Sequence, residues 1–398
     1  MNPSNFQFSR FFSKWWPVIL MGIATIGAYG LVLYSFGVFI GPIREETGWS
    51  NGALSTAFSL GLLISGVGAM FTGRLLDAVG SRPVMSGSLI VGSVLLYLTA
   101  SAESLPMFIV GWGVGGGIIG AGLFYNITMA ITTRLYLADR AKAFAILTLI
   151  GGLASPIYFP LAGVLVEWLG WRTALRVLTT ALIIIVLPSI VMIGGGNAQK
   201  NSAEKEPQGK NFLEILAAFK SRQFIMLLLA FSFSMCVLVA IQVHHVSAMQ
   251  ATGLTLSLAT ALAGIRGFLS LPGRALLAPI VRMLGTKGAI QVMYGAMAMG
   301  CASLFLAGSL GFVIGFTVIT GLTFGLIAPL HGLYAAEVFG EQHIGTMMGV
   351  QTTIVSVVAA SGPTLLGLTV DLSGGYSWLL MISILVTALA MFFLSLTR

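Results

Sequence analysis

Twelve apolar segments, each long enough to cross a bilayer, constrain this chain more than any other feature. A membrane-spanning helix needs about 20 mostly apolar residues, and the hydrocarbon offers no water to satisfy the groups of an irregular backbone. The predicted spans are Pro17–Ile40, Ala53–Leu75, Val84–Ser101, Pro106–Ile131, Ala143–Val166, Thr173–Ile193, Gln223–Val246, Thr255–Val281, Ala289–Gly308, Phe312–Ala336, Thr346–Val370 and Trp378–Leu396. The sequence therefore predicts an all-α membrane protein with twelve transmembrane helices.

The composition agrees with this fold class and excludes others. Only 8% of the residues are charged, whereas soluble domains carry about 25%. The net charge of +8 does not indicate nucleic-acid binding, because the basic residues gather in loops on one side of the expected membrane. Both cysteines, Cys236 and Cys301, lie inside apolar segments and indicate helix packing. We find no catalytic triad, metal-ligand cluster or nucleotide motif, so we expect no enzyme activity, cofactor or metal.

The segments form two groups of six on either side of one polar stretch. We expect residues 1–194 to form an N-terminal six-helix bundle, 195–222 a cytoplasmic linker and 223–398 a C-terminal six-helix bundle. The bundles are expected to be pseudo-symmetric, because Gly73–Arg82 after the second segment is echoed by Ala278–Lys287 after the eighth. This arrangement is typical of secondary transporters in which two halves rock around a midplane site.

The orientation follows from the loops. Most of the 20 Lys and Arg residues fall on the side that holds the N-terminus. Under the positive-inside rule that side is cytoplasmic. We therefore expect a multi-pass protein of the cell inner membrane, with both termini in the cytoplasm, acting as a monomer.

The stretch Ala251–Arg282 carries Arg266 and Arg274 far from either end of an apolar segment. An arginine at mid-bilayer depth costs from a few to more than about ten kcal/mol. No Asp or Glu lies at mid-depth of any predicted span. A guanidinium offers a bidentate fork to a planar carboxylate. We therefore expect an anionic substrate to supply the counter-charge, although backbone carbonyls or snorkelling to an interface are the alternatives.

Neutral and titratable polar residues of other spans are candidates for further substrate contacts. His244 and His245 change charge near neutral pH and are candidate proton carriers, although a hydrogen-bonded core histidine is the plain alternative. His331 and Tyr334 share a helix face. The remaining candidates, for which helix packing is the alternative reading, are Tyr29, Tyr34, Tyr125, Asn126, Tyr158 and Gln242.

The stretch Gly73–Pro83, GRLLDAVGSRP, resembles the loop signature of the major facilitator superfamily. The resemblance implies the twelve-helix fold and a gating role for residues around this loop and the next cytoplasmic one. The second copy departs from the signature, with Arg282 where an Asp is expected. The gating residues that the resemblance implies are Gly73, Asp77, Arg82, Arg134 and Arg140.

A narrower resemblance concerns substrate. Tyr34–Ser50 looks like the first helix of bacterial monocarboxylate transporter homologues and oxalate:formate antiporter relatives. Pro272-Gly273-Arg274 is similar to the stretch where those families place a substrate-binding arginine. Three charged residues of related carriers are absent here. Animal monocarboxylate carriers place an Asp at the position of Ser270 and a Lys at that of Tyr34, and oxalate:formate antiporters add a Lys that Thr346–Val370 lacks. The resemblance implies an organic anion and leaves its identity open.

We therefore expect a secondary active transporter that moves a mono- or dicarboxylate by rocker-switch alternating access. The coupling partner is a proton or an exchanged anion, or none if transport is facilitated diffusion. The alternative is efflux of amphipathic drugs or other metabolites by the same fold. A transporter-like receptor without net transport is a third class that the sequence leaves open.

Overall fold

The structure of the protein is a computed structural model that describes residues 3–193, 221–339 and 344–397. Every regular element in these ranges is a helix. The predicted linker, residues 195–222, lies almost entirely outside the described residues. The all-α prediction is confirmed for the chain that the structure describes.

Eleven helical stretches among the described residues are long and apolar enough to cross a membrane. One of them, Arg140–Met192, has 53 residues, far more than the roughly 20 that one span needs. Its backbone leaves helical geometry at Gly170, with φ 72° and ψ 161°. This stretch therefore holds two of the predicted spans, and the twelve-span prediction is confirmed.

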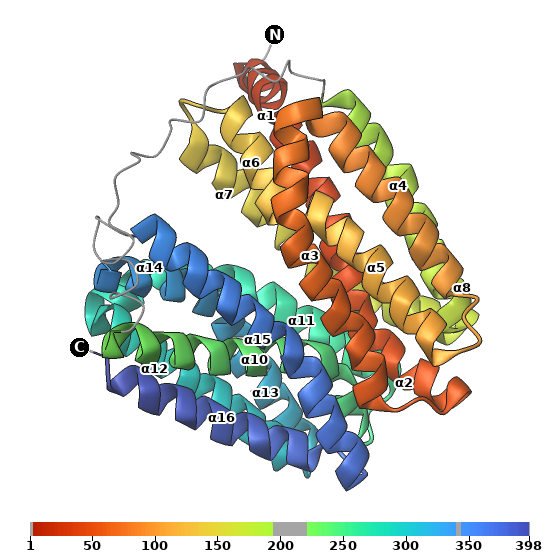
Figure 1. The fold of residues 1–398 in the computed structure, drawn as a ribbon, viewed down its shortest axis with the longest axis vertical. Coiled ribbons are helices and arrows are strands. Elements are labelled where there is room, and N and C mark those ends of the chain that lie inside the picture. The colour runs from red at the N-terminus through yellow and green to blue at the C-terminus, as the bar shows by residue number, and fades with distance from the viewer. Residues whose placement is uncertain (1–2, 194–220, 340–343, 398) are drawn as a thin grey trace. The chain divides into compact units, whose positions relative to one another are not determined.

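The chain divides into two compact units, which we describe separately. Unit 1 holds residues 1–42 and 60–200. In it α4 packs on α5 and α8, and α1 packs on α7 and α8 (Figure 1). Its helices are α1 (Pro3–Tyr29), η1 (Gly30–Tyr34), α2 (Ser35–Thr47), α3 (Asn51–Val79), α4 (Ser81–Thr99), α5 (Leu105–Leu123), α6 (Tyr125–Leu135), α7 (Arg140–Gly151) and α8 (Ala154–Met192).

Unit 2 holds residues 201–398 together with residues 43–59, the end of α2 and the start of α3. In it α10 packs on α15 and α16, α12 packs on α13 and α16, and α11 packs on α13. The helices after the linker are α10 (Arg222–Gln250), α11 (Leu256–Ala275), α12 (Leu277–Phe305), α13 (Leu310–Phe324), α14 (Ile327–Phe339), α15 (Ile344–Ser373) and α16 (Ser377–Ser395).

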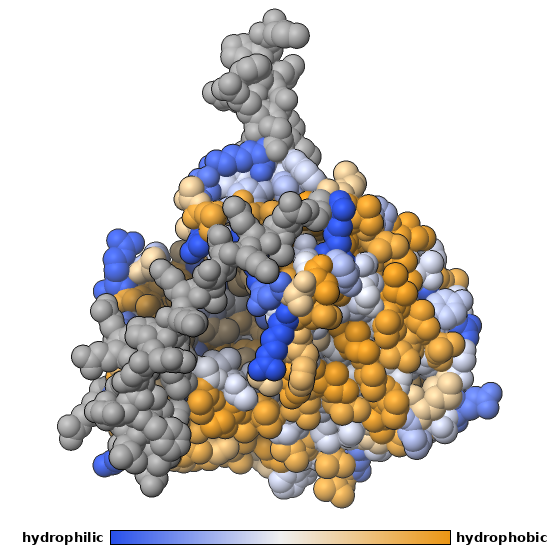
Figure 2. Space-filling view, turned by 45° about the horizontal axis from the view of Figure 1, so that its top comes forward, coloured by the Kyte–Doolittle hydropathy of each residue, from blue (hydrophilic) through white to orange (hydrophobic). Residues whose placement is uncertain are grey.

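Large apolar side chains cover much of the exposed surface, as the face drawn in Figure 2 shows. On α4, Val91, Val94 and Leu98 are about half exposed, whereas Leu89 and Leu96 are fully buried. The buried face packs on neighbouring helices, and the exposed face is apolar as well. A helix that is apolar all round suits a lipid surrounding, in which outward-facing apolar side chains carry no penalty.

Left-handed glycines reveal the internal repeat more clearly than the sequence does. All positive-φ residues among those described are glycines, and they fall into three pairs at nearly constant spacing, as the residue numbers show. Each pair occupies matching turns of the two halves, where a side chain would strain the backbone. The pairs are Gly48 with Gly253, Gly80 with Gly285, and Gly170 with Gly374.

Candidate functional site

Helices α11 and α13 approach so closely that only glycine fits at several points between them. A Cβ on Gly273 would lie 2.4 Å from the carbonyl oxygen of Leu322, and a Cβ on Gly321 would lie 2.8 Å from that of Arg266. Small residues of this kind let membrane helices bring their backbones together. The close approach places the Arg266 side chain directly against α13.

Arg266 is buried, with 2% of its surface exposed. Its Nε donates to Thr320 Oγ1 at 2.9 Å, and its Nη1 donates to Gln242 Oε1 at 3.1 Å. Hydrogen bonds to a charged group contribute about 1.5–3 kcal/mol each. Neither acceptor carries a charge, so these two bonds orient the guanidinium without neutralising it.

Two phenyl rings of α13 flank the same guanidinium. The Arg266 Cζ lies 4.8 Å from the ring centre of Phe324 and 5.9 Å from that of Phe316. Phe316, Thr320 and Phe324 are spaced by four residues and share one helix face. A cation over an aromatic face gains about 2 kcal/mol when it is desolvated. The α13 face therefore offsets part of the cost of burying this arginine.

The side-chain amide of Gln242 on α10 uses its oxygen in a hydrogen bond, whereas its nitrogen has no such bond among the described residues. Its Oε1 faces Arg266, because a guanidinium only donates hydrogen bonds and needs the carbonyl end of the amide. Its Nε2 is buried and has no hydrogen-bond partner among the described residues. A buried donor of this kind costs about 1–3 kcal/mol when it is unsatisfied. A ligand rich in hydrogen-bond acceptors would meet the positive charge of Arg266 and the donor Nε2 of Gln242 at the same place.

Backbone carbonyls fix a ring nitrogen of each of the two neighbouring histidines as a hydrogen-bond donor. His244 Nε2 lies 2.9 Å from the Pro363 oxygen, so this nitrogen carries the proton. His245 Nδ1 lies 2.9 Å from the Ile241 oxygen and carries the proton there. Both side chains are buried, and the His245 ring centre lies 6.4 Å from that of Phe316, which also flanks Arg266. His245 therefore borders the arginine cluster.

Arg274 has a different setting. It is exposed and lies in the last turn of α11. A Cβ on Gly325 would lie 3.1 Å from its Cγ and 3.2 Å from its Nε, so its stem crosses the break between α13 and α14. The structure therefore separates the two predicted arginines into one buried and one exposed group.

The candidates of unit 1 gather around a π-helical turn, η1, that the sequence did not predict. A Cβ on Gly30 would lie 2.1 Å from the Tyr158 ring, so Tyr158 rests on the backbone of this turn. The Tyr34 ring centre lies 5.5 Å from that of Phe159. Single π turns occur often at functional sites. Gly30 beside a run of apolar residues was the available signal, and it does not distinguish a π turn from ordinary helix packing.

Tyr125 and Asn126 open α6, directly after the chain leaves helical geometry at Phe124. The Tyr125 hydroxyl lies 2.3 Å from where a Cβ of Gly151 would be, and its ring centre lies 5.1 Å from that of Tyr29. Tyr125 is half-buried and Asn126 is exposed. Tyr125 thus lies beside Tyr29 at a helix break of unit 1.

His331 and Tyr334 on α14 are both buried and form separate contacts. His331 Nε2 lies 2.6 Å from the Tyr294 hydroxyl, and its ring stacks on Phe231 with centres 3.8 Å apart. Tyr334 bonds through its hydroxyl to Thr397 Oγ1 at 2.8 Å. Neither belongs to the cluster described here around Arg266.

The predicted gating residues lie at helix ends of unit 1. Asp77 and Arg134 form an ion pair between exposed side chains, which is worth about 0–1 kcal/mol. Arg82 donates to the Val191 oxygen at 2.6 Å and so caps the end of α8, where a cation is favourable. Gly73 has open space where its Cβ would lie, and Arg140 is the exposed first residue of α7.

The second half repeats the cap and not the ion pair. Lys287, the sequence counterpart of Arg82, donates to the Ser395 oxygen at 3.2 Å and to the Thr397 oxygen, which caps α16. Arg282 stands where Asp77 has its counterpart and bonds to Ala278 of its own turn. The cap is therefore shared by the halves, whereas Arg282 forms no ion pair like that of Asp77 and Arg134 with any residue that the structure describes.

The model of the Major Facilitator Superfamily matches residues 19–363, most of the chain. The chain belongs to the Major Facilitator Superfamily. It is 22% identical to the uncharacterised MFS-type transporter YcxA of Bacillus subtilis, over 95% of this chain and 93% of that protein. It is 24% identical to the oxalate:formate antiporter of Oxalobacter formigenes, over 58% and 54% of the two chains.

Solved structures of the superfamily share the fold. The nucleoside transporter NupG superposes with a TM-score of 0.80 at 12% identity, covering 95% of this chain and 97% of its own. A bacterial homologue of the human lysosomal transporter Spinster gives 0.71 at 16% identity, covering 98% and 96%. Membership of the superfamily identifies a transporter rather than an enzyme.

Sequence reasoning missed two groups in this superfamily member. Thr320, Phe316 and Phe324 were detectable only as a spacing of four within an apolar segment. Asp371, at the end of α15, accepts from the Asn51 and Gly52 backbone amides at 2.8 Å each. Its partner residues lie 320 and 319 positions away, so nothing local indicates this contact.

Proposed function

We propose that this superfamily member transports a small organic anion by alternating access and binds the anion's carboxylate at Arg266. The observation that carries the proposal is the buried guanidinium held by the neutral oxygens of Thr320 and Gln242. A carboxylate arriving at a buried cation gains attraction in a low-dielectric surrounding, where charge pairs interact most strongly. Bound substrate would then offset the cost of keeping this charge in the membrane.

The geometry suits a planar oxyanion. A guanidinium carries its N–H donors in a fixed plane, and Thr320 and Gln242 accept from two of its nitrogens. The Gln242 Nε2 supplies a further donor beside them. Arginine rather than lysine fits this use because its fork matches the two oxygens of a carboxylate. The candidates Tyr34, Tyr125, Asn126 and Tyr158 of unit 1, with His244 and Tyr334, stay proposed secondary contacts.

The name of one relative supports a carboxylate substrate. The oxalate:formate antiporter of Oxalobacter formigenes carries two carboxylates, and its match covers about half of each chain. An exchange of anions needs no proton carrier. We propose an exchanged anion or a proton as the coupling partner, with His244 and His245 as the candidate carriers of a proton.

The remaining features of the transporter are proposed from the sequence. Residues 1–194 and 223–398 form its two rocking halves, and the intervening stretch is a cytoplasmic linker. Both termini face the cytoplasm of the cell inner membrane, because the positive loops lie on that side. Asp77, Arg82, Arg134, Arg140 and Gly73 act as gating residues, and the transporter works as a monomer.

Efflux of amphipathic drugs is a second candidate, favoured by other relatives. The chain is 29% identical to the multidrug resistance protein MdtL of Klebsiella pneumoniae, over 41% of each chain. The Phe316 and Phe324 rings beside Arg266 also suit an apolar ligand. An anionic drug with an aromatic body would use both features.

Uptake by purified protein in liposomes separates these functions. Labelled lactate, formate, oxalate and succinate are offered with and without a pH gradient, and with each acid preloaded inside. The proposal expects at least one acid to enter above the rate of empty liposomes, and preloading or the gradient then identifies the coupling. Transport of neutral dyes with no uptake or exchange of any acid would contradict the carboxylate proposal and support efflux.

A further inference from the structure

Two aromatic rings stack on each other at one end of unit 1. The rings of Trp15 and Tyr136 are nearly parallel, with their centres 5.0 Å apart, and the Tyr136 hydroxyl donates to the Lys14 backbone oxygen at 2.8 Å. Both rings are buried, and they join helix α1 to the connection between α6 and α7, which pack on it (Figure 1). The stacked pair is therefore a rigid support for the side chains around it.

Two lysines lie close to the Trp15 ring. The Nζ of Lys14 lies 5.1 Å from the ring centre, and the Nζ of Lys142 lies 5.4 Å from it. The face of a tryptophan ring attracts a cation. One ring therefore holds two positive charges near each other, although like charges repel.

A single carboxylate accompanies these two lysines. Asp139 Oδ2 lies 2.7 Å from Lys14 Nζ, whereas Lys142 forms no ion pair within the ranges that the structure describes. Both lysines are exposed. One positive charge is therefore left without a counter-charge in this group of side chains. We call the group the Trp15 cluster, and its members are Lys14, Trp15, Tyr136, Asp139 and Lys142.

The helix that carries Lys142 does not gain from this charge. Arg140 and Lys142 are the first and third residues of α7. The N-terminal end of a helix carries a partial positive charge, so basic residues there are unfavourable. An anion beside Lys142 would offset this cost, as Asp139 does for Lys14.

The ends of the membrane spans place the Trp15 cluster at one face of the membrane. Leu135 and Leu137, on either side of Tyr136 in the chain, are 41% and 58% exposed. Exposed charge and exposed leucine thus occur together at the depth where tryptophan and tyrosine gather in membrane proteins. Three stretches long enough to cross a membrane begin or end within the cluster or next to it, namely Lys14–Thr47, Leu105–Leu135 and Arg140–Met192.

We propose that the Trp15 cluster binds the headgroup of an anionic phospholipid, with the phosphate at Lys142 and the acyl chains along Leu135 and Leu137. A phospholipid fits both features, because its headgroup carries the negative charge and its chains are apolar. A free phosphate ion offers the charge alone. This end of unit 1 is on the expected cytoplasmic side, where the leaflet carries a negative surface potential. The site is independent of the transported substrate.

Lipid binding to the purified protein tests the proposal. Native mass spectrometry from detergent compares dioleoylphosphatidylglycerol with dioleoylphosphatidylcholine, which has the same chains and no net charge. We expect the wild type to bind the anionic lipid more tightly. Lys142→Gln should lower the affinity for that lipid by about fivefold, the contribution of one basic residue near a membrane surface. Its affinity for phosphatidylcholine should stay unchanged.

Asp139→Asn should act in the opposite direction. It removes the carboxylate that neutralises Lys14, so the net positive charge of the Trp15 cluster increases. Affinity for phosphatidylglycerol should therefore rise, by up to about fivefold. A purely structural role of the Lys14–Asp139 ion pair predicts a loss of binding instead, because the substitution would then loosen the cluster.

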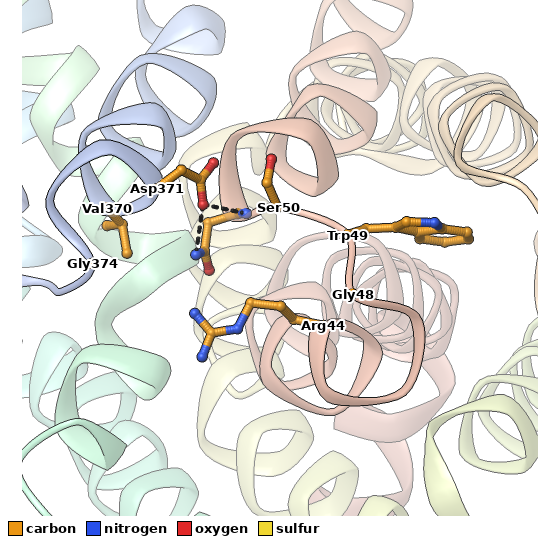
Figure 3. Close-up of a pocket in the computed structure, with 8 residues that line it drawn as sticks. Arg44, Gly48, Trp49, Ser50, Val370, Asp371 and Gly374 are labelled. Atoms are coloured by element: carbon orange, nitrogen blue, oxygen red, sulfur yellow. Dashed lines mark hydrogen bonds between the residues drawn. The ribbon is translucent and has the colours of Figure 1, made fainter.

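Arg44→Gln is the matched control. Arg44 is exposed at the other end of the span Lys14–Thr47, where it lines a pocket that Asp371 also borders (Figure 3). This substitution also removes one positive charge, and it leaves the Trp15 cluster intact. Binding of phosphatidylglycerol should therefore stay at the wild-type level.

Four results would overturn the proposal. The wild type binds the two lipids equally, Asp139→Asn weakens binding, Arg44→Gln weakens it as much as Lys142→Gln does, or inorganic phosphate at the concentration of the lipid displaces it. The third result would mean that net charge alone attracts the lipid. The fourth would mean that the site takes a free phosphate ion.

Discussion

The two arginines of α11 lie eight residues apart, yet the structure treats them differently. Arg266 is 2% exposed and is held by Thr320 and Gln242 between two phenyl rings. Arg274 is exposed in the last turn and contacts the helix break at Gly325. The buried arginine has fixed geometry and little access to water, and this low-dielectric surrounding strengthens its attraction for an approaching negative charge. Water and dissolved ions screen the charge of the exposed Arg274.

This difference assigns unequal roles within the proposed function. A group that binds by direct contact needs orientation, which Arg266 has through its two hydrogen bonds. A group that acts through charge alone needs only position, and its effect falls with ionic strength. We therefore propose Arg266 as the carboxylate-binding residue and Arg274 as a long-range contributor, and each prediction below tests that ranking.

The largest expected effect is that of Arg266→Ala. Removing one partner of a buried charge pair costs about 3–5 kcal/mol, so carboxylate uptake should fall by more than about 100-fold. Uptake by the Arg266→Lys variant should fall nearly as far, because an ammonium lacks the two-pronged donor geometry of a guanidinium and the Nε bond to Thr320. Initial uptake rates in liposomes measure this. Arg274→Ala serves as the matched control, and equal losses in the two alanine variants would remove the ranking.

Gln242→Glu should have the next largest effect. It places a carboxylate of nearly the same shape beside Arg266, where it competes with the substrate's own carboxylate. We expect uptake of acids to fall by about tenfold or more, the factor that 1.4 kcal/mol produces. Transport of neutral dyes, if present, should not fall. Faster acid uptake by Gln242→Glu would contradict an anion site at Arg266.

Thr320→Val should have a smaller effect. It keeps the shape of the side chain and removes the acceptor of the Arg266 Nε bond. Losing one hydrogen bond to a charged group costs about 1.5–3 kcal/mol at most, so we expect KM to rise by roughly ten-fold with kcat less affected. Thr320→Ser, which keeps the hydroxyl, should stay near wild type. A loss in Thr320→Ser equal to that in Thr320→Val would point to packing instead.

Arg274→Lys should have the smallest effect. It preserves the charge at an exposed position, where exposed ion pairs contribute about 0–1 kcal/mol, so uptake should change by less than about threefold. Any loss in Arg274→Ala should shrink as salt is raised, because screening removes long-range attraction. An Arg274→Lys variant as inactive as Arg266→Lys would reverse the assignment of roles.

Much of the fold could be predicted from the sequence, since span length and hydropathy are local properties. The spans follow from them, and the loop at Gly73–Pro83 placed the chain in its superfamily. The π turn at Gly30–Tyr34 could not be predicted, because a glycine beside apolar residues is compatible with ordinary helix geometry. The repeat of left-handed glycines was visible in advance only at Gly80 and Gly285, where neighbouring residues also match.

The candidate site was predicted in part. The sequence indicated Arg266 and Gln242 as separate candidates, and it did not indicate that they bond to each other. Thr320 and the two phenylalanines stayed hidden, because an apolar span gives no sign of which face meets a neighbouring helix. The sequence carried no sign of the role of Asp371, since its partners at Asn51 and Gly52 are remote in the chain.

The sequence by itself determined that this chain crosses a membrane as helices, and that it carries two arginines which an apolar segment does not readily accept. Only the tertiary structure decided that Arg266 is buried and Arg274 is exposed. The physical reason is that hydropathy depends on each segment alone, whereas the burial of a side chain depends on which helices meet. Here the glycines at 273 and 321 let α11 and α13 meet at Arg266.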